Sequence, residues 1–206
     1  MIELVTTDGL FRLDGGEWEV TNNIWLIGDD RQVIVVDAAH DPAPIAAAVA
    51  GRRVVAIALT HGHNDHINAA ADLQDAVDAP ILLHPADRML WDQVYPDRGP
   101  DVDLVDGATI AAGGTELRVL HTPGHSPGGC CFVVDDGPHV FSGDTLFCGG
   151  PGATGRSFSD FSVIIESIRR RLLTLPPETL VHTGHGESTT VGREAPDLEE
   201  WLRRGH

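Results

Sequence analysis

Residues 60–66 read THGHNDH, and they follow directly on the apolar stretch VVAIALT at residues 54–60. A short apolar run that ends in a polar loop is typical of a buried strand, and loops at the carboxyl ends of strands commonly present the side chains of a site. The segment supplies four potential metal ligands within six residues, His61, His63, Asp65 and His66. Helix-start polarity, with Asp65 as an N-cap, would explain one histidine and one aspartate but not all four. We therefore interpret residues 61–66 as a metal-binding segment.

Three further candidate ligands follow along the chain, each in a turn rich in Gly or Pro after an apolar stretch. They are His125 in HTPGHSPGG, Asp144 in FSGDTLF and His185 in HTGHGES. Glycines beside a ligand let the backbone turn sharply and let a metal and a substrate approach closely. Imidazoles combined with carboxylates suit zinc, iron or manganese, and seven ligands are enough for a site with two ions.

The pattern HxHxDH followed by separate His, Asp and His residues resembles the metallo-β-lactamase fold hydrolases, and the match runs over most of the chain. The resemblance implies that His61, His63 and His125 hold one metal. It implies that Asp65, His66 and His185 hold the second metal and that Asp144 bridges the two. It also implies a four-layer αββα sandwich.

Within that superfamily, the stretches TPGHSPGG, SGDTLF and TGHGESTTVG are most similar to the glyoxalase II-like branch, the hydroxyacylglutathione hydrolases. β-Lactamases of the best-known type place Cys where Asp144 stands, which argues against antibiotic hydrolysis as the main activity. We expect two divalent ions, zinc first, with iron or manganese as alternatives. Two such ions lower the pKa of a shared water into the neutral range, so that a bridging hydroxide can attack a thioester. Asp65 is also the candidate catalytic residue, because its carboxylate can orient that hydroxide.

Two weaker predictions concern residues around the metal ligands. Arg156 and Phe158, in the loop CGGPGATGRSF, resemble the basic-then-aromatic pair that grips glutathione, although a surface Arg and a core Phe fit equally well. Asp37, which closes the apolar stretch QVIVVD, matches a strand-end Asp of the family. It is expected either to hold a ligand histidine from behind or to serve only at a turn or helix entry. The stretch GGPGATGR is longer than the GGCGR-like form of glyoxalase II. The class of bond that is hydrolysed therefore stays undecided between a thioester and another acyl bond.

Three other functions remain open at this point. A persulfide dioxygenase shares HxHxDH but uses one iron held by three of the positions, and its motif GRTDF reads GRSFSDF here. A lactonase is a second alternative within the same fold. A metal-binding module without turnover is the third. Elemental analysis separates about two zinc ions per chain from about one iron.

The order of elements predicts an α/β fold, with residues 1–206 as one domain in which sheets pack together beneath outer helices. Helices are expected at residues 42–49, 65–77, 85–94, 161–175 and 195–202. Strands are expected around NIWLIG, QVIVVDA, VVAIALT, ILLH, ELRVLHT, GCCFVVDD, HVFSGDT and residues 180–182, with Pro138 in a hairpin turn. The other histidines match no ligand position and are expected to be exposed or hydrogen-bonded: His40, His84, His121, His139, His182 and His206.

Charge and composition limit the partners. The 206 residues carry a formal net charge of −17 and contain no Lys, so the mean field repels nucleic acids and anionic lipid surfaces. We expect a small-molecule thioester or acyl substrate, no nucleic-acid or membrane partner, and either a monomer or a homodimer. The acidic N-terminus without a long apolar run and three cysteines unsuited to a disulfide framework indicate a cytoplasmic protein.

Overall fold

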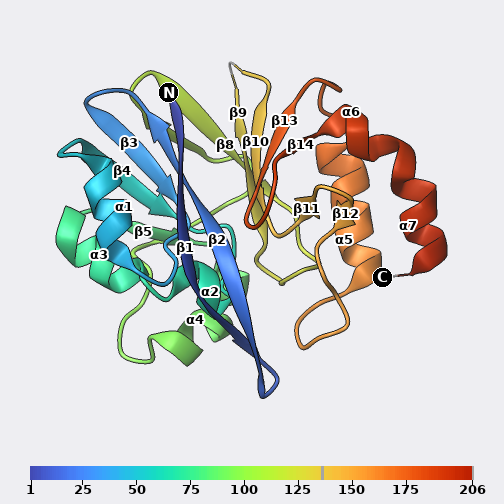
Figure 1. The fold of residues 1–206 in the computed structure, drawn as a ribbon, viewed down its shortest axis with the longest axis horizontal. Coiled ribbons are helices and arrows are strands. Elements are labelled where there is room, and N and C mark those ends of the chain that lie inside the picture. The colour runs from blue at the N-terminus through green and yellow to red at the C-terminus, as the bar shows by residue number, and fades with distance from the viewer. Residues whose placement is uncertain (136, 206) are drawn as a thin grey trace.

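The computed structural model describes residues 1–135 and 137–205, so His206 lies outside the described residues. Its chain builds two six-stranded sheets that face each other, with helices outside both (Figure 1). The first sheet has the order β1 (Ile2–Leu13), β2 (Gly16–Gly28), β3 (Gln32–Val36), β4 (Arg53–Ala58), β5 (Ile81–Leu83) and β6 (Val102–Asp103). The second has the order β14 (Thr189–Thr190), β13 (Leu180–Thr183), β10 (His139–Gly143), β9 (Cys130–Val134), β8 (Thr115–His121) and β7 (Thr109–Ala112).

Both sheets are mixed. In the first, β1, β2 and β3 pair antiparallel, whereas β3, β4, β5 and β6 run parallel. In the second, β10 and β13 are parallel and the other neighbours are antiparallel. A short ribbon of β11 (Leu146–Phe147) and β12 (Gly150–Pro151) lies beside the second sheet.

Three buried cores separate the four layers, and strand alternation decides which side chain enters which core. On β9, Phe132 enters the core between the two sheets, while Cys131 and Val133 enter the core beneath the second sheet's helices. On β3, Ile34 faces the core between the sheets and Val35 faces the core beneath the first sheet's helices. The αββα sandwich predicted from the element order is therefore confirmed.

The helices lie outside the sheets. Those of the first half are α1 (Pro42–Val49), α2 (Asn64–Ile67), α3 (Ala70–Val77), the 3₁₀ turn η1 (Pro85–Asp87) and α4 (Arg88–Val94). Those of the second half are α5 (Phe161–Ser167), the π-helix η2 (Ile168–Leu172), α6 (Val191–Glu194), the 3₁₀ turn η3 (Ala195–Asp197) and α7 (Leu198–Arg204). The helix at 42–49 is as predicted. No helix in the described ranges is long and apolar enough to cross a membrane.

The helices expected over 85–94 and 195–202 each begin as a 3₁₀ turn, and the second extends to Arg204. Two other predicted helices differ more. The single helix expected over 65–77 is broken into α2 and α3 at Asn68 and Ala69, and its N-cap is His63, with no capping bond from a side chain. The helix expected over 161–175 continues past Ser167 as a π-helix and ends at Leu172. In both, the apolar periodicity located the helix, but the pattern does not report hydrogen-bond spacing or a local break.

The long hairpin of β1 and β2 is the largest element that the sequence prediction captured only in part. Its strands pair in register from Ile2 with Ile27 to Leu13 with Gly16, which leaves Asp14 and Gly15 as a two-residue turn. Both turn residues have positive φ, as a type I′ turn requires, and Asp-Gly is a typical sequence for it. The hairpin crosses the front of the molecule, and its tip extends past α2 and α4 (Figure 1).

Candidate metal centre

The seven predicted ligands all lie in loops that follow strands or at the start of a helix beside such a loop. His61, His63, Asp65 and His66 follow β4, while His125, Asp144 and His185 follow β8, β10 and β13. Strands β8, β10 and β13 run in the same direction, as the pairings with β9 and between β10 and β13 show. Their carboxyl ends therefore share one edge of the second sheet. The loop after β4 of the first sheet meets this edge, which brings together residues up to 124 positions apart in sequence, His61 and His185.

The ligand atoms of the seven residues form three overlapping groups, within each of which they lie within 4.8 Å of one another. The groups are His61, His63 and His125; His61, His66 and Asp144; and Asp65, His66 and His185. Because the middle group shares one member with each of the others, the seven side chains make one continuous cluster.

Asp144 lies between the two outer groups. Its Oδ1 is 3.3 Å from Nε2 of His66, and its Oδ2 is 3.4 Å from Nε2 of His185 and 3.6 Å from Nε2 of His125. A Cβ at Gly184 would lie 2.3 Å from Asp144 Oδ1, so glycine is needed for this close approach. The carboxylate therefore has the placement expected of a bridging ligand.

Four of the five histidines have Nδ1 held by a partner outside the cluster. The partners are the Thr60 hydroxyl for His61 at 3.0 Å, the Asp37 carboxylate for His66 at 2.8 Å, the Ala153 carbonyl for His125 at 2.8 Å and the Thr21 carbonyl for His185 at 2.8 Å. Holding Nδ1–H in this way leaves Nε2 as a lone-pair donor aimed at the cluster, as in metal-binding histidines. In His63, Nδ1 instead faces Nε2 of His125 at 3.0 Å.

Buried nitrogen and oxygen atoms that can bind a metal but have no hydrogen-bond partner show that the cluster fits metal ions. Within the described part of the chain these atoms are Nε2 of His61, Nε2 of His63, Oδ1 of Asp65 and Oδ1 of Asp144. A buried polar atom without a partner is costly, and native proteins satisfy nearly all of them. Mixed imidazole and carboxylate donors are the set preferred by zinc and by iron or manganese.

The electrostatics of the cluster are also those of a cation site. Burial opposes the charge of His185, but the Asp144 carboxylate outweighs it and raises the pKa of His185 to about 10. Burial and the neighbouring His125 lower the pKa of His63 to about 3. Burial would raise the pKa of Asp65, yet His66 and His185 lower it to about 2. Two carboxylates thus stay ionised in a buried site, where a cation can replace the protons that compensate them.

Asp37 lies behind the cluster, against the ring of His66. Its carboxylate accepts hydrogen bonds from the Thr60 backbone N–H at 2.7 Å, the Thr60 hydroxyl at 2.9 Å and His66 Nδ1 at 2.8 Å. Its φ of 64° is in the left-handed region, which is uncommon for a residue other than Gly and more accessible to Asp and Asn. This backbone turns the side chain from the end of β3 toward the loop after β4.

Asp87 is a site residue that the sequence prediction missed. It is fully buried, and its carboxylate accepts hydrogen bonds from the Gly62 N–H at 2.8 Å, the Ser126 hydroxyl at 2.7 Å and the Gly128 N–H at 2.5 Å. Burial raises its pKa against these hydrogen bonds. It joins the loop of His61 and His63 to the loop of His125. Its sequence signal is only its position in the first turn of the helix expected after the strand ILLH, which many exposed aspartates share.

Asn22 and His40 are two further residues that the prediction did not place at the centre. Asn22 is fully buried on β2, and its side-chain nitrogen lies 3.2 Å from Oδ2 of Asp65. His40 matches the expectation of a hydrogen-bonded histidine, with Nε2 2.8 Å from Asn22 Oδ1. Neither carries a motif, so their relation to Asp65 emerges only when the strands pack.

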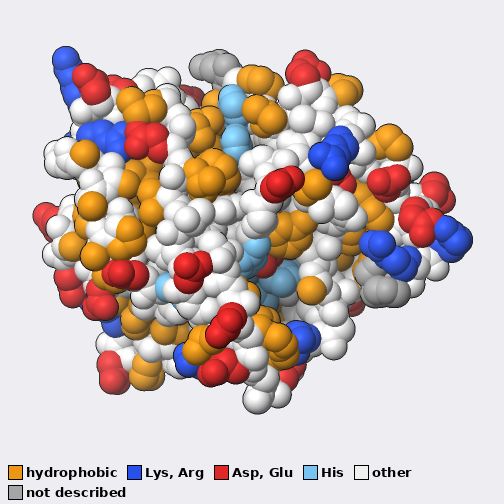
Figure 2. All heavy atoms as spheres, viewed as in Figure 1, with side chains coloured by type: hydrophobic (Ala, Val, Ile, Leu, Met, Phe, Trp, Pro, Cys, Tyr) orange, Lys and Arg blue, Asp and Glu red, His pale blue; other side chains and the backbone are white. Residues whose placement is uncertain are grey.

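The mouth of the centre lies between the hairpin tip and the loop that contains Arg156. The Arg156 guanidinium is 4.0 Å from the centroid of the Trp18 ring, and Ser157 N–H donates to Asp14 at 3.0 Å. Phe11 packs against Trp18 and edge-on to the ring of His63, with centroids 5.6 and 5.4 Å away. Figure 2 shows pale blue histidine atoms near the middle of this face.

Phe158 is 45% exposed, so it is not the core residue that the alternative interpretation requires. Its φ of 70° turns the exposed loop back toward α5. Arg156 is also exposed, and its charge acts on the nearby Asp14 carboxylate, whose pKa it helps to lower after the hydrogen bonds from Ser157. Both side chains are available at the mouth, and their role in substrate binding stays a prediction.

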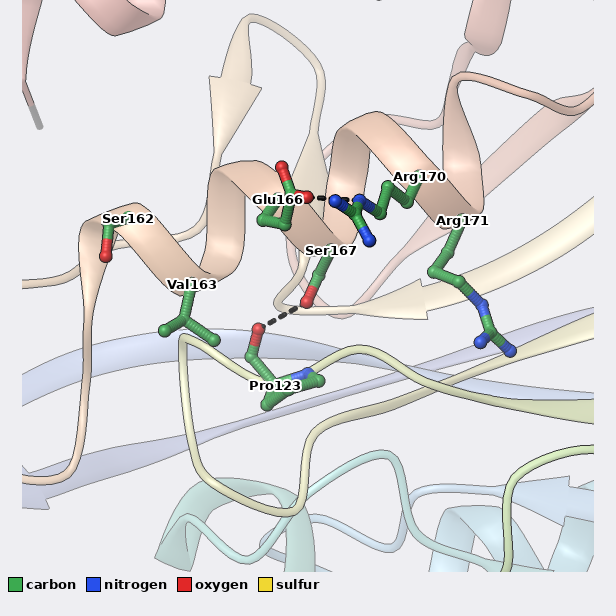
Figure 3. Close-up of a pocket in the computed structure, with 7 residues that line it drawn as sticks. All are labelled: Pro123, Ser162, Val163, Glu166, Ser167, Arg170 and Arg171. Carbon is green, nitrogen blue, oxygen red and sulfur yellow. Dashed lines mark hydrogen bonds and ion pairs between the residues drawn. The ribbon is translucent and has the colours of Figure 1, made fainter.

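A groove of about 440 Å³ lies outside this centre, between α5 and the loop before His125 (Figure 3). It is lined by Pro123, Ser162, Val163, Glu166, Ser167, Arg170 and Arg171. The Ser167 hydroxyl donates to the Pro123 carbonyl at 2.7 Å, and Arg170 pairs with Glu166. None of these residues is a predicted ligand, and the Ser167 contact serves to hold the loop of His125.

Comparisons with known proteins agree with this geometry. Residues 18–185 match the family model of the metallo-beta-lactamase superfamily. The "Probable metallo-hydrolase YqgX" of Bacillus subtilis is 36% identical over 82% of this chain and 87% of its own. The "Hydroxyacylglutathione hydrolase GloC" of Haemophilus influenzae is 33% identical over 66% and 70%. The crystal structure of TTHA1623 in a di-iron-bound form is similar with a TM-score of 0.77 and 36% identity, covering 85% of this chain and 93% of that one.

The family model spans β2 from Trp18 onward, the HGHNDH segment and the loops of His125, Asp144 and His185. The fold, the edge at which the ligands gather and the matched residues all lead to the same assignment: this chain belongs to the metallo-β-lactamase superfamily.

Proposed function

We propose that the protein is a metal-dependent hydrolase of small thioesters or related acyl compounds. The observation that carries this proposal is the continuous cluster of seven His and Asp side chains, in which four buried donor atoms lack partners. His61, His63 and His125 would hold one divalent ion, and Asp65, His66 and His185 a second, with Asp144 between them. When bound, such ions supply Lewis-acid activation of water and of a carbonyl oxygen.

The chain's own residues do the positioning. Oδ1 of Asp65 is a buried acceptor without a partner, so it can accept a hydrogen bond from an attacking water and orient it toward the substrate carbonyl. Asp37 and Thr60 hold the rings of His66 and His61 in one orientation. This preorganisation lowers the cost of reaching the reactive geometry.

The leaving group argues for a thioester. The chain has no Lys, and its single tyrosine, Tyr95, donates its hydroxyl hydrogen to the Ile67 carbonyl on the far side of α2. An alkoxide or amine leaves poorly without a proton donor, whereas a thiol has a pKa of about 8.5 and leaves as a thiolate. The similarity to GloC supports the same class of substrate.

The mouth adds a preference for an anionic carrier. In a chain with a net charge of −17, Arg156 places an exposed positive charge over an aromatic wall of Phe11 and Trp18. A thiol carrier with a carboxylate and an apolar portion would complement this surface.

The test is hydrolysis by zinc-loaded protein of S-lactoylglutathione, simple acyl thioesters, matched oxygen esters and lactones, with thiol release or acid production as readout. We expect thioester turnover to exceed that of the oxygen esters, and Asp144→Ala to lack it. Turnover of lactones without thioesters would overturn the thioester assignment while leaving a hydrolase. A chain that holds one iron and consumes oxygen with a persulfide would overturn the hydrolase.

A further inference from the structure

The side of Asp65 that faces β2 is closed by Asn22 rather than by solvent. Asn22 has no exposed surface, and its Nδ2 is 3.2 Å from Asp65 Oδ2. The same nitrogen is 3.3 Å from His66 Nε2 and 3.5 Å from His185 Nε2. It therefore touches all three members of the group Asp65, His66 and His185.

Which atom of the Asn22 amide faces these ligands decides what Asn22 does there. With the oxygen toward the group, Asn22 would be a ligand, and with the nitrogen toward it, Asn22 is a hydrogen-bond donor. Amide orientation follows from the surrounding hydrogen bonds. Here the neighbours of Asn22 leave a single consistent arrangement.

The arrangement begins at Asn68. Its Oδ1 lies 2.5 Å from the backbone N of His40, which can only donate, so this atom is the amide oxygen. Asn68 Nδ2 then donates to Nδ1 of His40 at 3.1 Å, which makes Nδ1 an acceptor. A neutral imidazole whose Nδ1 accepts carries its hydrogen on Nε2.

The arrangement continues from His40 to Asp65. His40 Nε2–H donates to an atom of Asn22 at 2.8 Å, which must be the oxygen. The nitrogen of Asn22 consequently faces Asp65, whose ionised carboxylate only accepts. Turning the Asn22 amide over would set N–H against N–H at His40, so Asn22 is a donor and not a metal ligand.

We propose that Asn22, oriented by His40, is the positioning residue for Asp65. The hydrogen bonds from His40 through Asn22 to Asp65 set the affinity for the cation held by the group Asp65, His66 and His185. The inference rests on the proposed metal centre and deepens it. Asp65 Oδ2, which accepts from Asn22, also lies 3.3 Å from His185 Nε2 and 3.6 Å from His66 Nε2, so donation from Asn22 fixes the rotation of the carboxylate among the other ligand atoms of its group. Partners of this kind change metal affinity by about 10–100-fold in other proteins.

Two backbone features show that the fold makes room for His40. Its φ of 60° is in the left-handed region, which His enters more readily than most residues. A Cβ at Gly9 on β1 would lie 2.1 Å from His40 Nδ1, so the absence of a side chain at Gly9 keeps the imidazole in place. The φ of Gly9 is not positive, so glycine serves here for space and not for backbone conformation.

The experiment measures zinc stoichiometry and the two zinc affinities of the full chain by competition with a chromophoric chelator. We expect Asn22→Ala to keep one zinc at wild-type affinity and to bind the other about 10–100-fold more weakly. His40→Asn keeps a residue that tolerates positive φ but is too short to reach Asn22, and it should weaken the same zinc. The double variant should be no weaker than Asn22→Ala, because His40 acts through Asn22.

Matched controls separate positioning from general destabilisation. Thr189→Val removes a buried hydrogen bond to Glu194 that involves none of the seven ligands, and it should leave both zinc affinities unchanged. Gly9→Ala, which displaces His40, should reproduce the selective loss. Gly99→Ala, whose Cβ would meet only the end of Arg88 at 3.4 Å, should not.

Several results would overturn the inference. They are unchanged zinc binding in Asn22→Ala and in Gly9→Ala, equal weakening of both zinc ions, additive effects of Asn22→Ala and His40→Asn, or an equal loss in Thr189→Val. Should Asn22→Ala not fold, His40→Asn and Gly9→Ala carry the same test. Because zinc binding needs no substrate, failure of the thioester assay leaves this result standing, and an unchanged zinc affinity leaves the proposed hydrolase standing.

Discussion

Nδ1 of His66 lies 2.8 Å from Oδ2 of Asp37, and both side chains are buried, with 0% and 2% of their surfaces exposed. One residue follows β3 and the other follows β4, two parallel neighbours in the first sheet. The carboxylate therefore holds the imidazole at the carboxyl edge of the first sheet, where it meets the ligands that follow β8, β10 and β13 of the second.

Asp37→Asn tests this relationship. Asn tolerates the positive φ of position 37 but lacks the charge and the second acceptor oxygen. We expect zinc affinity to fall about 10–100-fold, because His66 loses the partner that orients its ring and raises its basicity. Chelator competition measures the change, with Asp41→Asn, at the exposed N-cap of α1, as control. Wild-type affinity in Asp37→Asn would show that Asp37 is only a turn residue.

Asp144→Ala tests the bridging carboxylate. Because Asp144 lies between His125 and the pair His66 and His185, its loss should lower the content of both metals together. Activity should fall by more than the roughly 100-fold that is lost when a residue that hydrogen-bonds to a metal ligand is replaced. Elemental analysis and the thioester assay are the readouts, with Asp135→Ala, at the exposed pair with Arg118, as control. Retention of two metals and full turnover would contradict the assignment.

Asp87→Asn tests the link between the loop of His61 and His63 and the loop of His125. An amide puts an NH₂ group where two backbone N–H groups and a hydroxyl donate, so at least one buried donor loses its partner. We expect the free energy of unfolding of the metal-free chain to fall by about 1–3 kcal/mol. Denaturant unfolding measures this, and Asp92→Asn on the exposed side of α4 should change little. Equal stability of the two variants would count against Asp87.

Arg156→Ala tests the mouth. If the Arg156 guanidinium binds a carboxylate of the substrate far from the reacting bond, it stabilises the bound substrate and the transition state equally. Removing it should therefore raise KM about tenfold while kcat changes less. Steady-state kinetics on the best thioester give both constants, and Arg193→Ala is an exposed control on α6. An unchanged KM would remove Arg156 from the site.

His182 predicts a pH dependence of stability away from the centre. Burial, and then the neighbouring His139, lower the pKa of His182 to about 4, below the usual value of about 6.5. Above pH 6.5 the folded and unfolded chains are both neutral at this residue. As the pH falls from 6.5 to 4, only the unfolded chain takes up the proton, so the free energy of unfolding falls, by at most about 3 kcal/mol.

Unfolding by urea between pH 7 and 4 measures this loss. His182→Phe, which keeps a ring between Trp25 and Phe141, should remove this part of the pH dependence. Leu180→Ala, an exposed change on the same strand, should lower stability equally at every pH. An unchanged slope in His182→Phe would mean that other groups cause the loss.

The candidate ligands were predictable because local sequence carries their signal. HGHNDH places four donors in six residues, and Gly-rich turns after apolar stretches mark His125, Asp144 and His185. The αββα layers were predictable from strand and helix periodicity. Asp14-Gly15 is also a typical type I′ sequence, so this turn has a local signal too.

Asp87 and the chain from His40 through Asn22 to Asp65 were not predictable in the same way. Asn22 lies on β2 and Asp65 on α2, 43 positions apart in sequence, and no residue type or spacing marks them as partners. The break of the predicted helix 65–77 at Asn68 is similar, because Asn68 uses its side chain to hold His40.

The sequence by itself determined the type of chemistry, since donor identity, strand-end position and glycine turns are local properties of the chain. Only the tertiary structure decided which side chains hold those donors, which way the Asn22 amide points and that Trp18 meets Arg156 at the mouth. These are contacts between residues distant in sequence, and a hydrogen bond depends on distances and directions that exist only once the sheets have packed.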